Sequence, residues 1–274
     1  MKREEKDGIV WMDCSRCGAM FPAFDTGNEI SRTMESLYAA DAHRHCAKCR
    51  EELSAEAERQ EAEQRRREFL ASIPRLAAAS GIPDLYRIHR ETGKPLTSPL
   101  VPHVVKWLWD HRECNLLISG KTGVGKSTSA CFVAVKMLEE GKRVRYVKLR
   151  RLLSEWREAR TSDEAFADER FFDRIQKLHL LILDEVADKT KPTESGQEMM
   201  YELLDMIADG EIKTRLWMLG NFRQGVLDEV FGDADPVFRR IEENFLCAGV
   251  TEKGIEVFHV YRKSGSANRE LGRT

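Results

Sequence analysis

Residues 120–127 read Gly-Lys-Thr-Gly-Val-Gly-Lys-Ser, and this stretch decides the fold of the chain. It fits the phosphate-binding pattern G-x-x-x-x-G-K-[ST] at every fixed position. An apolar run at residues 115–119 precedes it as a predicted buried strand, and residues 128–140 follow with helical spacing. A glycine-rich turn between a strand and a helix N-terminus presents backbone N–H groups to an anion. The context therefore predicts a loop that binds nucleotide phosphates.

We assign the loop and the residue after it to nucleotide contact. Lys126 is expected to reach the β- and γ-phosphates, and the Ser127 hydroxyl is expected to ligate Mg²⁺. The glycines let backbone N–H groups turn toward phosphate oxygens. ATP and Mg²⁺ are thus the expected cofactors. The assigned residues are Gly120, Lys121, Thr122, Gly123, Val124, Gly125, Lys126, Ser127 and Thr128.

A second acidic motif lies at residues 180–185, which read Leu-Leu-Ile-Leu-Asp-Glu. Four apolar residues followed by two acids are typical of the strand that completes an ATP-hydrolysis site. Asp184 is expected to hold Mg²⁺, and Glu185 is expected to polarise the attacking water as general base. An acid after a strand can also cap a helix, but the upstream phosphate loop favours the catalytic interpretation.

Four of the seven cysteines form two C-x-x-C pairs, Cys14 with Cys17 and Cys46 with Cys49. Paired knuckles of this spacing suit tetrahedral Zn²⁺. His43 and His45 stand just before the second pair, so replacement of one cysteine ligand by histidine is an alternative, as is an iron–sulfur centre. The other three cysteines, at positions 114, 131 and 247, have apolar neighbours and are predicted to be buried thiols.

The length of 274 residues and the net charge of −2 limit the number of domains and the kinds of partner that the chain can have. The length suits one α/β domain with a small appendage, and the charge gives no overall basic field for nucleic acid. No apolar run is long enough to cross a bilayer, and the charged start has no apolar signal core. We expect a cytoplasmic protein without a membrane partner.

Strands and helices alternate along the chain, which predicts a parallel five-stranded sheet covered on both faces. The expected domains are a zinc-binding domain at residues 1–50, a charged helical linker at 51–79 and an ATPase core at 80–274. Ile73-Pro74 and Gly81-Ile82-Pro83 are breaker signals that lie between the charged stretch and the globular core. The five predicted strands are residues 115–119, 144–148, 180–184, 216–219 and 255–261.

Two further features carry open alternatives. Asn221 follows the fourth predicted strand, where it could orient water and the γ-phosphate or could cap the next helix. A predicted helix at 149–160 places Arg150, Arg151, Arg157 and Arg160 on its polar side. That side is either a solvated surface or a surface that follows the phosphates of single-stranded DNA.

The order of these motifs resembles AAA+ ATPases of the DnaC/DnaI helicase-loader group, with the transposition helper IstB as a close relative. The resemblance covers residue 80 to the end and is carried by Gly-Ile-Pro-x-x-Tyr-Arg at 81–87, the two ATP-site motifs, Gly220-Asn221 and Phe-Arg-Arg-Ile at 238–241. The chain after Arg240 is too short for the helical lid of most AAA+ proteins, so the resemblance is to lidless cores. This chain departs from the group at Gly220, a position where the group usually has Ser or Thr.

The resemblance implies that Arg240, with Arg239 beside it, acts as an arginine finger in a neighbouring subunit's ATP site, and hence that the chain forms a homo-oligomer. DnaI-like loaders pair a zinc-binding N-terminal domain with such a core. The preferred hypothesis is therefore an ATP-dependent loader that binds single-stranded DNA and a replicative DNA helicase. The alternatives are an IstB-like helper of a DNA transposase and a nucleotide-gated zinc adaptor without significant catalysis.

Overall fold

The computed structural model describes residues 3–7, 9–25, 44–86, 102–162, 164, 166–186, 193–222, 235–251, 254–262 and 269–273. The chain forms two compact units, residues Met1–Ala71 and Ser72–Thr274. His43 and Arg87, which the sequence analysis named, lie outside the described residues. The division into 1–50, 51–79 and 80–274 stays a prediction.

The first unit contains three antiparallel strands, β1 (Arg3–Lys6), β2 (Ile9–Asp13) and β3 (Met20–Asp25). The register between β2 and β3 shifts at Val10 and Trp11, where Trp11 lies opposite Pro22. A proline has no N–H to donate to the ladder, which is why such residues occur at irregular points of a sheet. The loop between β2 and β3 contains the first C-x-x-C pair.

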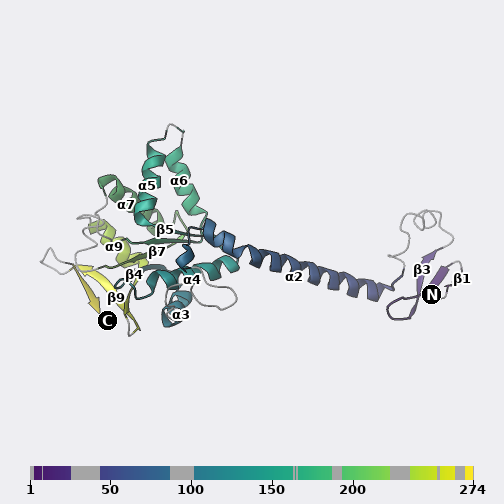
Figure 1. Ribbon diagram of the computed structural model, residues 1–274. Helices are drawn as coiled ribbons and strands as arrows, with labels where there is room; N and C mark the ends of the chain where they lie inside the picture. Colours follow the sequence, from purple (N-terminus) through teal and green to yellow (C-terminus); the bar gives the residue numbers. More distant parts are fainter. Residues whose placement is uncertain are drawn as a thin grey trace. The chain divides into compact units, whose positions relative to one another are not determined.

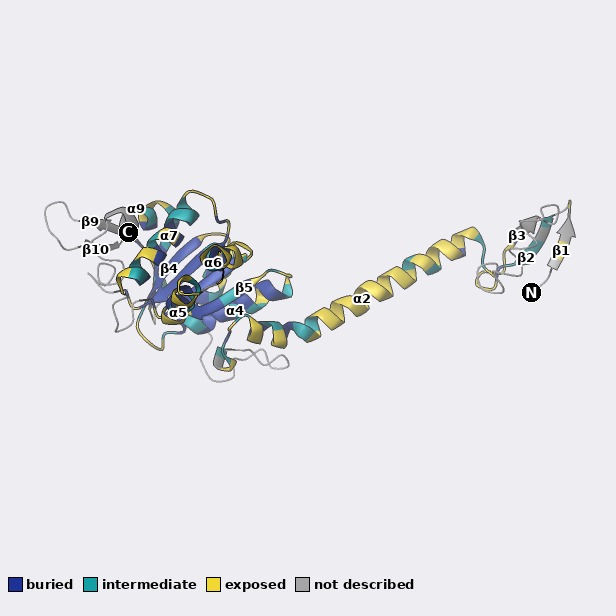
Figure 2. Cartoon of the chain, turned by 90° about the horizontal axis from the view of Figure 1, so that it is seen from above, coloured by how far each residue is buried: buried dark blue, intermediate teal, exposed yellow. Residues whose placement is uncertain are grey.

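Helix α2 (Ala47–Ala79) begins inside the second C-x-x-C pair and is largely exposed (Figure 2). Its polar surface includes two Glu–Arg pairs spaced four residues apart, Glu61 with Arg65 and Glu63 with Arg67. Such pairs support an exposed helix. Pro74, a breaker signal in the sequence, does not end the helix, which continues to Ala79. Ile73 and Ala77 in the last turns are buried, and their packing offsets the local cost of proline.

The second unit is built on a seven-stranded sheet in the order β10-β9-β8-β4-β7-β6-β5 (Figure 1). Five of its strands run parallel, and β9 and β10 extend it by antiparallel pairing. The bounds are β4 (Asn115–Ser119), β5 (Val144–Lys148), β6 (Leu180–Asp184), β7 (Arg215–Gly220), β8 (Phe245–Thr251), β9 (Gly254–Arg262) and β10 (Arg269–Arg273).

Five parallel strands were predicted, but the fifth was placed wrongly. The parallel partner of β4 is β8 at Phe245–Thr251, whereas the predicted strand at 255–261 belongs to β9 and runs antiparallel to β8. The sequence of β8 contains Ala248 and Gly249, residue types that are depleted in strands. Its position between β4 and β9 compensates, because the neighbouring strands satisfy both edges of its backbone.

Helices cover both faces of this sheet (Figure 1). On one face lie α3 (Pro102–Asp110) and α4 (Lys126–Glu139). On the other lie α5 (Leu149–Arg160), α6 (Ala167–Gln176), α7 (Glu194–Ala208) and α9 (Asp235–Asn244). Strands β4 and β6 are buried along their whole length. Parallel strands covered on both faces read as continuous apolar runs, which explains why the sequence located these two.

Candidate nucleotide-binding site

The phosphate loop joins the carboxyl end of β4 to the start of α4. Gly123 and Gly125 have φ values of +87° and +88°, which residues with a Cβ rarely adopt. A Cβ at Gly120 would lie 2.6 Å from the Val250 carbonyl oxygen of β8. Glycine is therefore required at both ends of the loop, for conformation at one and for close approach at the other.

The predicted residues from three strands meet around one cavity of about 210 Å³. Its lining includes Lys126 and Ser127 from the loop, Asp184 and Glu185 after β6, and Asn221 after β7. These positions follow the carboxyl ends of neighbouring parallel strands, where α/β proteins bind their ligands. The cavity is lined also by Tyr86, Thr122, Gly123, Gly125, Thr128 and Gly220.

Lys126 is folded back onto its own loop. Its Nζ donates hydrogen bonds to the carbonyl oxygens of Gly120 at 2.6 Å and Lys121 at 2.9 Å. Burial lowers the pKa of Lys126, and the negative charge of Asp184 opposes that effect. The ammonium group thus lies beside the loop, and its contact with nucleotide phosphates stays a prediction.

Both oxygens of the Asp184 carboxylate are engaged. Oδ1 accepts the backbone N–H of Glu185 at 2.8 Å, and Oδ2 accepts the hydroxyl of Tyr146 from β5. Burial, together with the nearby Asp184 charge, raises the pKa of Tyr146, so the phenol stays protonated and remains the donor. No sequence motif marks Tyr146, so its contact with Asp184 was not predicted.

Glu185 has a positive φ of 57° and turns its side chain toward Lys148 at the end of β5. Glu185 Oε1 lies 2.5 Å from Lys148 Nζ, and both side chains are about half exposed. The hydrogen bond to Glu185 raises the pKa of Lys148. The carboxylate predicted to be the general base is therefore ion-paired in this structure.

The residues present fit Mg²⁺. The Ser127 hydroxyl and the Asp184 carboxylate supply the hard oxygen ligands that this ion prefers, and both line the cavity. When bound there with ATP, Mg²⁺ neutralises phosphate charge. Asn221 is exposed at the same cavity, and its role toward water and the γ-phosphate stays a prediction.

The arginine pair of α9 lies apart from that cavity's lining. Arg240 forms an ion pair with Asp205 of α7, and its guanidinium carbon lies 5.8 Å from the ring centroid of Tyr201. Arg239 is exposed and pairs with Glu243 of its own helix at 2.7 Å. Arg240 would have to leave Asp205 before it could act as a finger, a role that stays a prediction.

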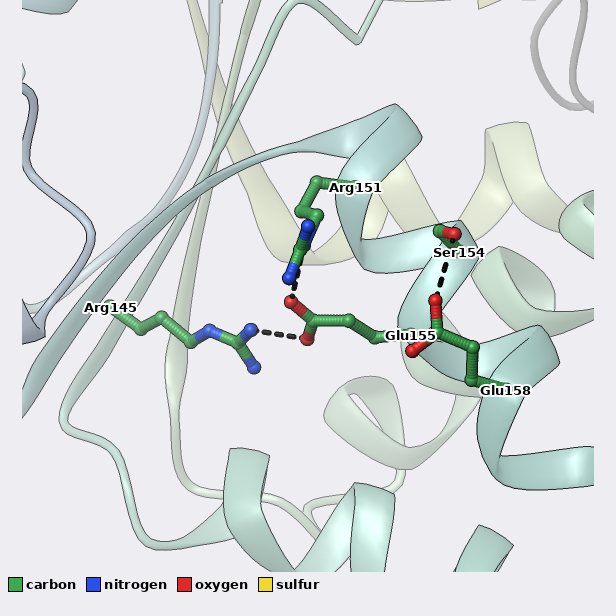
Figure 3. Close-up of polar contacts among 5 residues, drawn as sticks. All are labelled: Arg145, Arg151, Ser154, Glu155 and Glu158. Atoms are coloured by element: carbon green, nitrogen blue, oxygen red, sulfur yellow. Dashed lines mark hydrogen bonds and ion pairs between the residues drawn. The ribbon is translucent and has the colours of Figure 1, made fainter. Parts of the chain in front are cut away.

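Two of the four arginines of α5, Arg151 and Arg160, are paired with acids. Arg151 lies 3.1 Å from Glu155, and Arg145 of β5 contacts the other oxygen of the same carboxylate (Figure 3). Arg160 lies 3.5 Å from Glu198 of α7. Arg157 donates to the Leu153 carbonyl at 3.3 Å. These contacts favour the solvated-surface interpretation over a continuous phosphate-following surface.

The four predicted cysteine ligands come together in the first unit. The Sγ atoms of Cys14, Cys17, Cys46 and Cys49 all lie within 4.8 Å of one another, and those of Cys17 and Cys46 are 3.8 Å apart. Four thiolates at about 2.3 Å from a tetrahedral zinc ion are separated by about 3.8 Å. The cluster therefore fits Zn²⁺.

Neighbouring groups support this thiol cluster. Burial opposes ionisation of Cys14, but backbone hydrogen bonds from Cys17, Cys46 and Arg16 lower its pKa to about 6. His45 Nε2 lies 3.1 Å from Ser15 Oγ rather than among the thiols. Arg16 Nη2 donates to Glu56 Oε1 at 2.6 Å, which ties the first knuckle to α2.

Burial of the three remaining cysteines was predicted, and it is observed for two of them. Cys131 and Cys247 are buried, as expected, but Cys114 is exposed in the turn before β4.

Among the described residues, no helix is long and apolar enough to cross a membrane.

The fold and the loop define a P-loop nucleotide-binding protein with a mixed α/β architecture. The family described as IstB-like ATP binding protein matches residues 33–237, and the chain belongs to it. This result confirms the IstB-like part of the resemblance inferred from the motifs.

Two curated relatives are insertion-sequence proteins. A candidate ATP-binding protein of IS1162 from Pseudomonas fluorescens is 32% identical over 98 residues, which cover 36% of this chain and 41% of the relative. A candidate insertion-sequence ATP-binding protein from Sinorhizobium fredii is 26% identical over 165 residues, or 60% of this chain and 53% of the relative. The chain thus spans about half the length, or less, of these relatives.

Solved structures with a similar core include the DnaC helicase loader and DnaI. The DnaC structure has a TM-score of 0.44 and 13% identity, and the match covers 54% of this chain and 86% of that one. The DnaI structure has a TM-score of 0.44 and 16% identity, and the match covers 61% of this chain and 90% of the DnaI chain.

Proposed function

We propose that this chain binds Mg²⁺–ATP in the cavity between β4, β6 and β7 and hydrolyses it. The observation that carries the proposal is the meeting of Lys126, Ser127, Asp184, Glu185 and Asn221 around one cavity. Together they offer a phosphate cradle, a cation, two oxygen ligands for Mg²⁺, a carboxylate base and an amide. These are the parts that phosphoryl transfer to water requires.

Each residue has a distinct task in that reaction. The loop N–H groups and Lys126 bind phosphate oxygens, and Ser127 with Asp184 would hold Mg²⁺. Glu185 takes a proton from the attacking water once it leaves Lys148. Asn221 orients that water against the γ-phosphate. An arginine from a neighbouring subunit, for which Arg240 is the sequence candidate, completes the charge stabilisation in a homo-oligomer.

We further propose that ATP turnover serves a DNA-handling partner. Both curated relatives are described as insertion-sequence ATP-binding proteins, which favours an IstB-like helper of a DNA transposase. The four-cysteine cluster is the observation that keeps a second candidate, a loader of a replicative DNA helicase on single-stranded DNA. In either case the zinc-binding segment is the proposed docking element, and DNA contact is a proposal for both.

A pull-down separates the two candidates. The full chain and a Cys14→Ser variant are each incubated with ATP in a lysate. In separate reactions they are incubated with purified transposase or with purified replicative helicase. Capture of the transposase by the full chain supports the helper, and capture of the helicase supports the loader. Loss of capture in Cys14→Ser assigns docking to the zinc segment. Capture of neither partner contradicts both roles.

A further inference from the structure

Tyr146 contacts the magnesium-ligand candidate Asp184 through its side chain. The hydroxyl donates to Asp184 Oδ2, and both residues are buried, with exposed fractions of 5% and 6%. The other carboxylate oxygen is held by the Glu185 N–H. A metal-bound carboxylate needs such partners to fix its orientation. Tyr146 thus sets the direction in which Asp184 presents its oxygens to the cavity.

The backbone of the same tyrosine holds the end of helix α2. Strand β5 is the last strand at its end of the described sheet, so one side of its backbone faces away from β6. There the Tyr146 N–H donates to the Ser80 carbonyl oxygen at 2.8 Å. A Cβ at Gly81 would lie 2.3 Å from the Tyr146 carbonyl oxygen. The turn after α2 is therefore pressed against this one residue.

That turn is a well-defined cap. Gly81 has a φ of +80°, and its N–H bonds to the Ala78 carbonyl while the Ile82 N–H bonds to the Ala77 carbonyl. This bond pair is the Schellman arrangement, which satisfies the last carbonyls of a helix. Ile82 and Ala77 are both buried, at 1% and 2% exposed. The cap is therefore joined to the last turn of the helix by two hydrogen bonds and a buried contact pair.

The chain then enters the nucleotide cavity within five residues. The 3₁₀ turn η1 (Asp84–Tyr86) places Tyr86 in the cavity lining. Its ring centroid lies 6.3 Å from that of Tyr146, with an interplanar angle of 66°. Edge-on aromatic pairs of this kind add to packing stability. Residues 81–86, part of the segment that carried the family resemblance, thus connect α2 to the site.

We propose that Tyr146 is a positioning residue that orients Asp184 toward Mg²⁺ and couples the nucleotide site to the end of helix α2. Engagement of Asp184 by the ion fixes the phenol, and the same strand segment then holds Ser80 and Gly81 more firmly. Helix α2 begins at Ala47 and contains Cys49, one of the four thiols of the zinc cluster. The inference rests on the proposed binding of Mg²⁺–ATP.

The test compares the full-length protein with Tyr146→Phe, which keeps the ring and removes the hydroxyl. Binding of a fluorescent, non-hydrolysable ATP analogue is titrated with Mg²⁺, and hydrogen–deuterium exchange is measured for peptides covering 76–86 and 144–148. In the native chain, Mg²⁺ with the analogue slows exchange in both segments. In Tyr146→Phe the half-saturating Mg²⁺ concentration rises about tenfold, since a charge-assisted hydrogen bond is lost, and the protection at 76–86 disappears.

Tyr201→Phe is the matched control, because it removes a phenol hydroxyl from α7 rather than from the contact with Asp184. It should match the native protein in both measurements. Unchanged Mg²⁺ dependence in Tyr146→Phe overturns the positioning role, and retained protection at 76–86 overturns the coupling. Equal effects in both variants overturn the inference as a whole. If the native chain binds no analogue at all, the proposed ATP site itself fails.

Discussion

The ion pair between Lys148 and Glu185 gives a quantitative prediction, because it occupies the carboxylate that is expected to act as the general base. The two charged atoms are 2.5 Å apart, yet the side chains are 52% and 41% exposed. Solvent screens pairs this exposed, so the contact is worth about 1 kcal/mol or less. That energy corresponds to about a fivefold change in the population of free Glu185.

We therefore expect Lys148→Met to raise basal ATP hydrolysis by up to about fivefold at low salt, with a change in unfolding free energy below about 1 kcal/mol. The assay is steady-state phosphate release with saturating Mg²⁺–ATP, repeated at about 1 M salt. The difference between the variant and the native protein should shrink at high salt, because the screening length falls to about 3 Å.

A matched control is Lys106→Met, which removes a lysine paired with Asp110 at 2.6 Å on α3, also exposed. It should leave hydrolysis unchanged. A tenfold loss of hydrolysis in Lys148→Met with normal nucleotide binding would refute the reasoning, since Lys148 would then assist the reaction instead of restraining Glu185. An increase of equal size at low and high salt would refute the electrostatic origin.

Three further outcomes are expected. Gly81→Ala should lower the unfolding free energy, measured by urea denaturation, by roughly 2–5 kcal/mol, because the new Cβ would meet both a positive φ and the Tyr146 carbonyl oxygen. The control Gly141→Ala has a φ of +77° but open space around the new Cβ, so its unfolding free energy should fall by only about 1–2 kcal/mol. Equal losses in the two variants would contradict the packing argument. Chelation should release one zinc ion per chain and unfold the cysteine segment while nucleotide binding persists; a chain purified without zinc would count against the cluster. Arg240→Ala should lose hydrolysis and recover it when mixed with Glu185→Gln subunits, whereas failure to recover would reduce Arg240 to a structural partner of Asp205.

The parts of the core that could be located from the sequence are buried parallel strands and motifs with fixed spacing. Strands at 115–119, 144–148 and 180–184 were predicted with the bounds that the structure has, because buried parallel strands form short apolar runs between breakers. The phosphate loop and the Asp184-Glu185 pair were found because their chemistry requires fixed spacings. The paired cysteines were found for the same reason.

What the sequence did not reveal depends on contacts between distant segments. Strand β8 was missed because its Ala and Gly residues weaken the strand signal, which its position between β4 and β9 compensates. The contact of Tyr146 with Asp184 depends on β5 lying beside β6, and no local pattern encodes that neighbour. Pro74 lies inside α2 without ending it, because burial of Ile73 and Ala77 outweighs a local preference.

The most direct test of the central claim measures ATP binding and phosphate release in parallel for the native chain, Lys126→Ala and Glu185→Gln. The account predicts Mg²⁺-dependent hydrolysis by the native chain, loss of nucleotide binding in Lys126→Ala, and retained binding without hydrolysis in Glu185→Gln. Hydrolysis at the native rate in either variant would contradict the assignment of this cavity as the site of ATP hydrolysis.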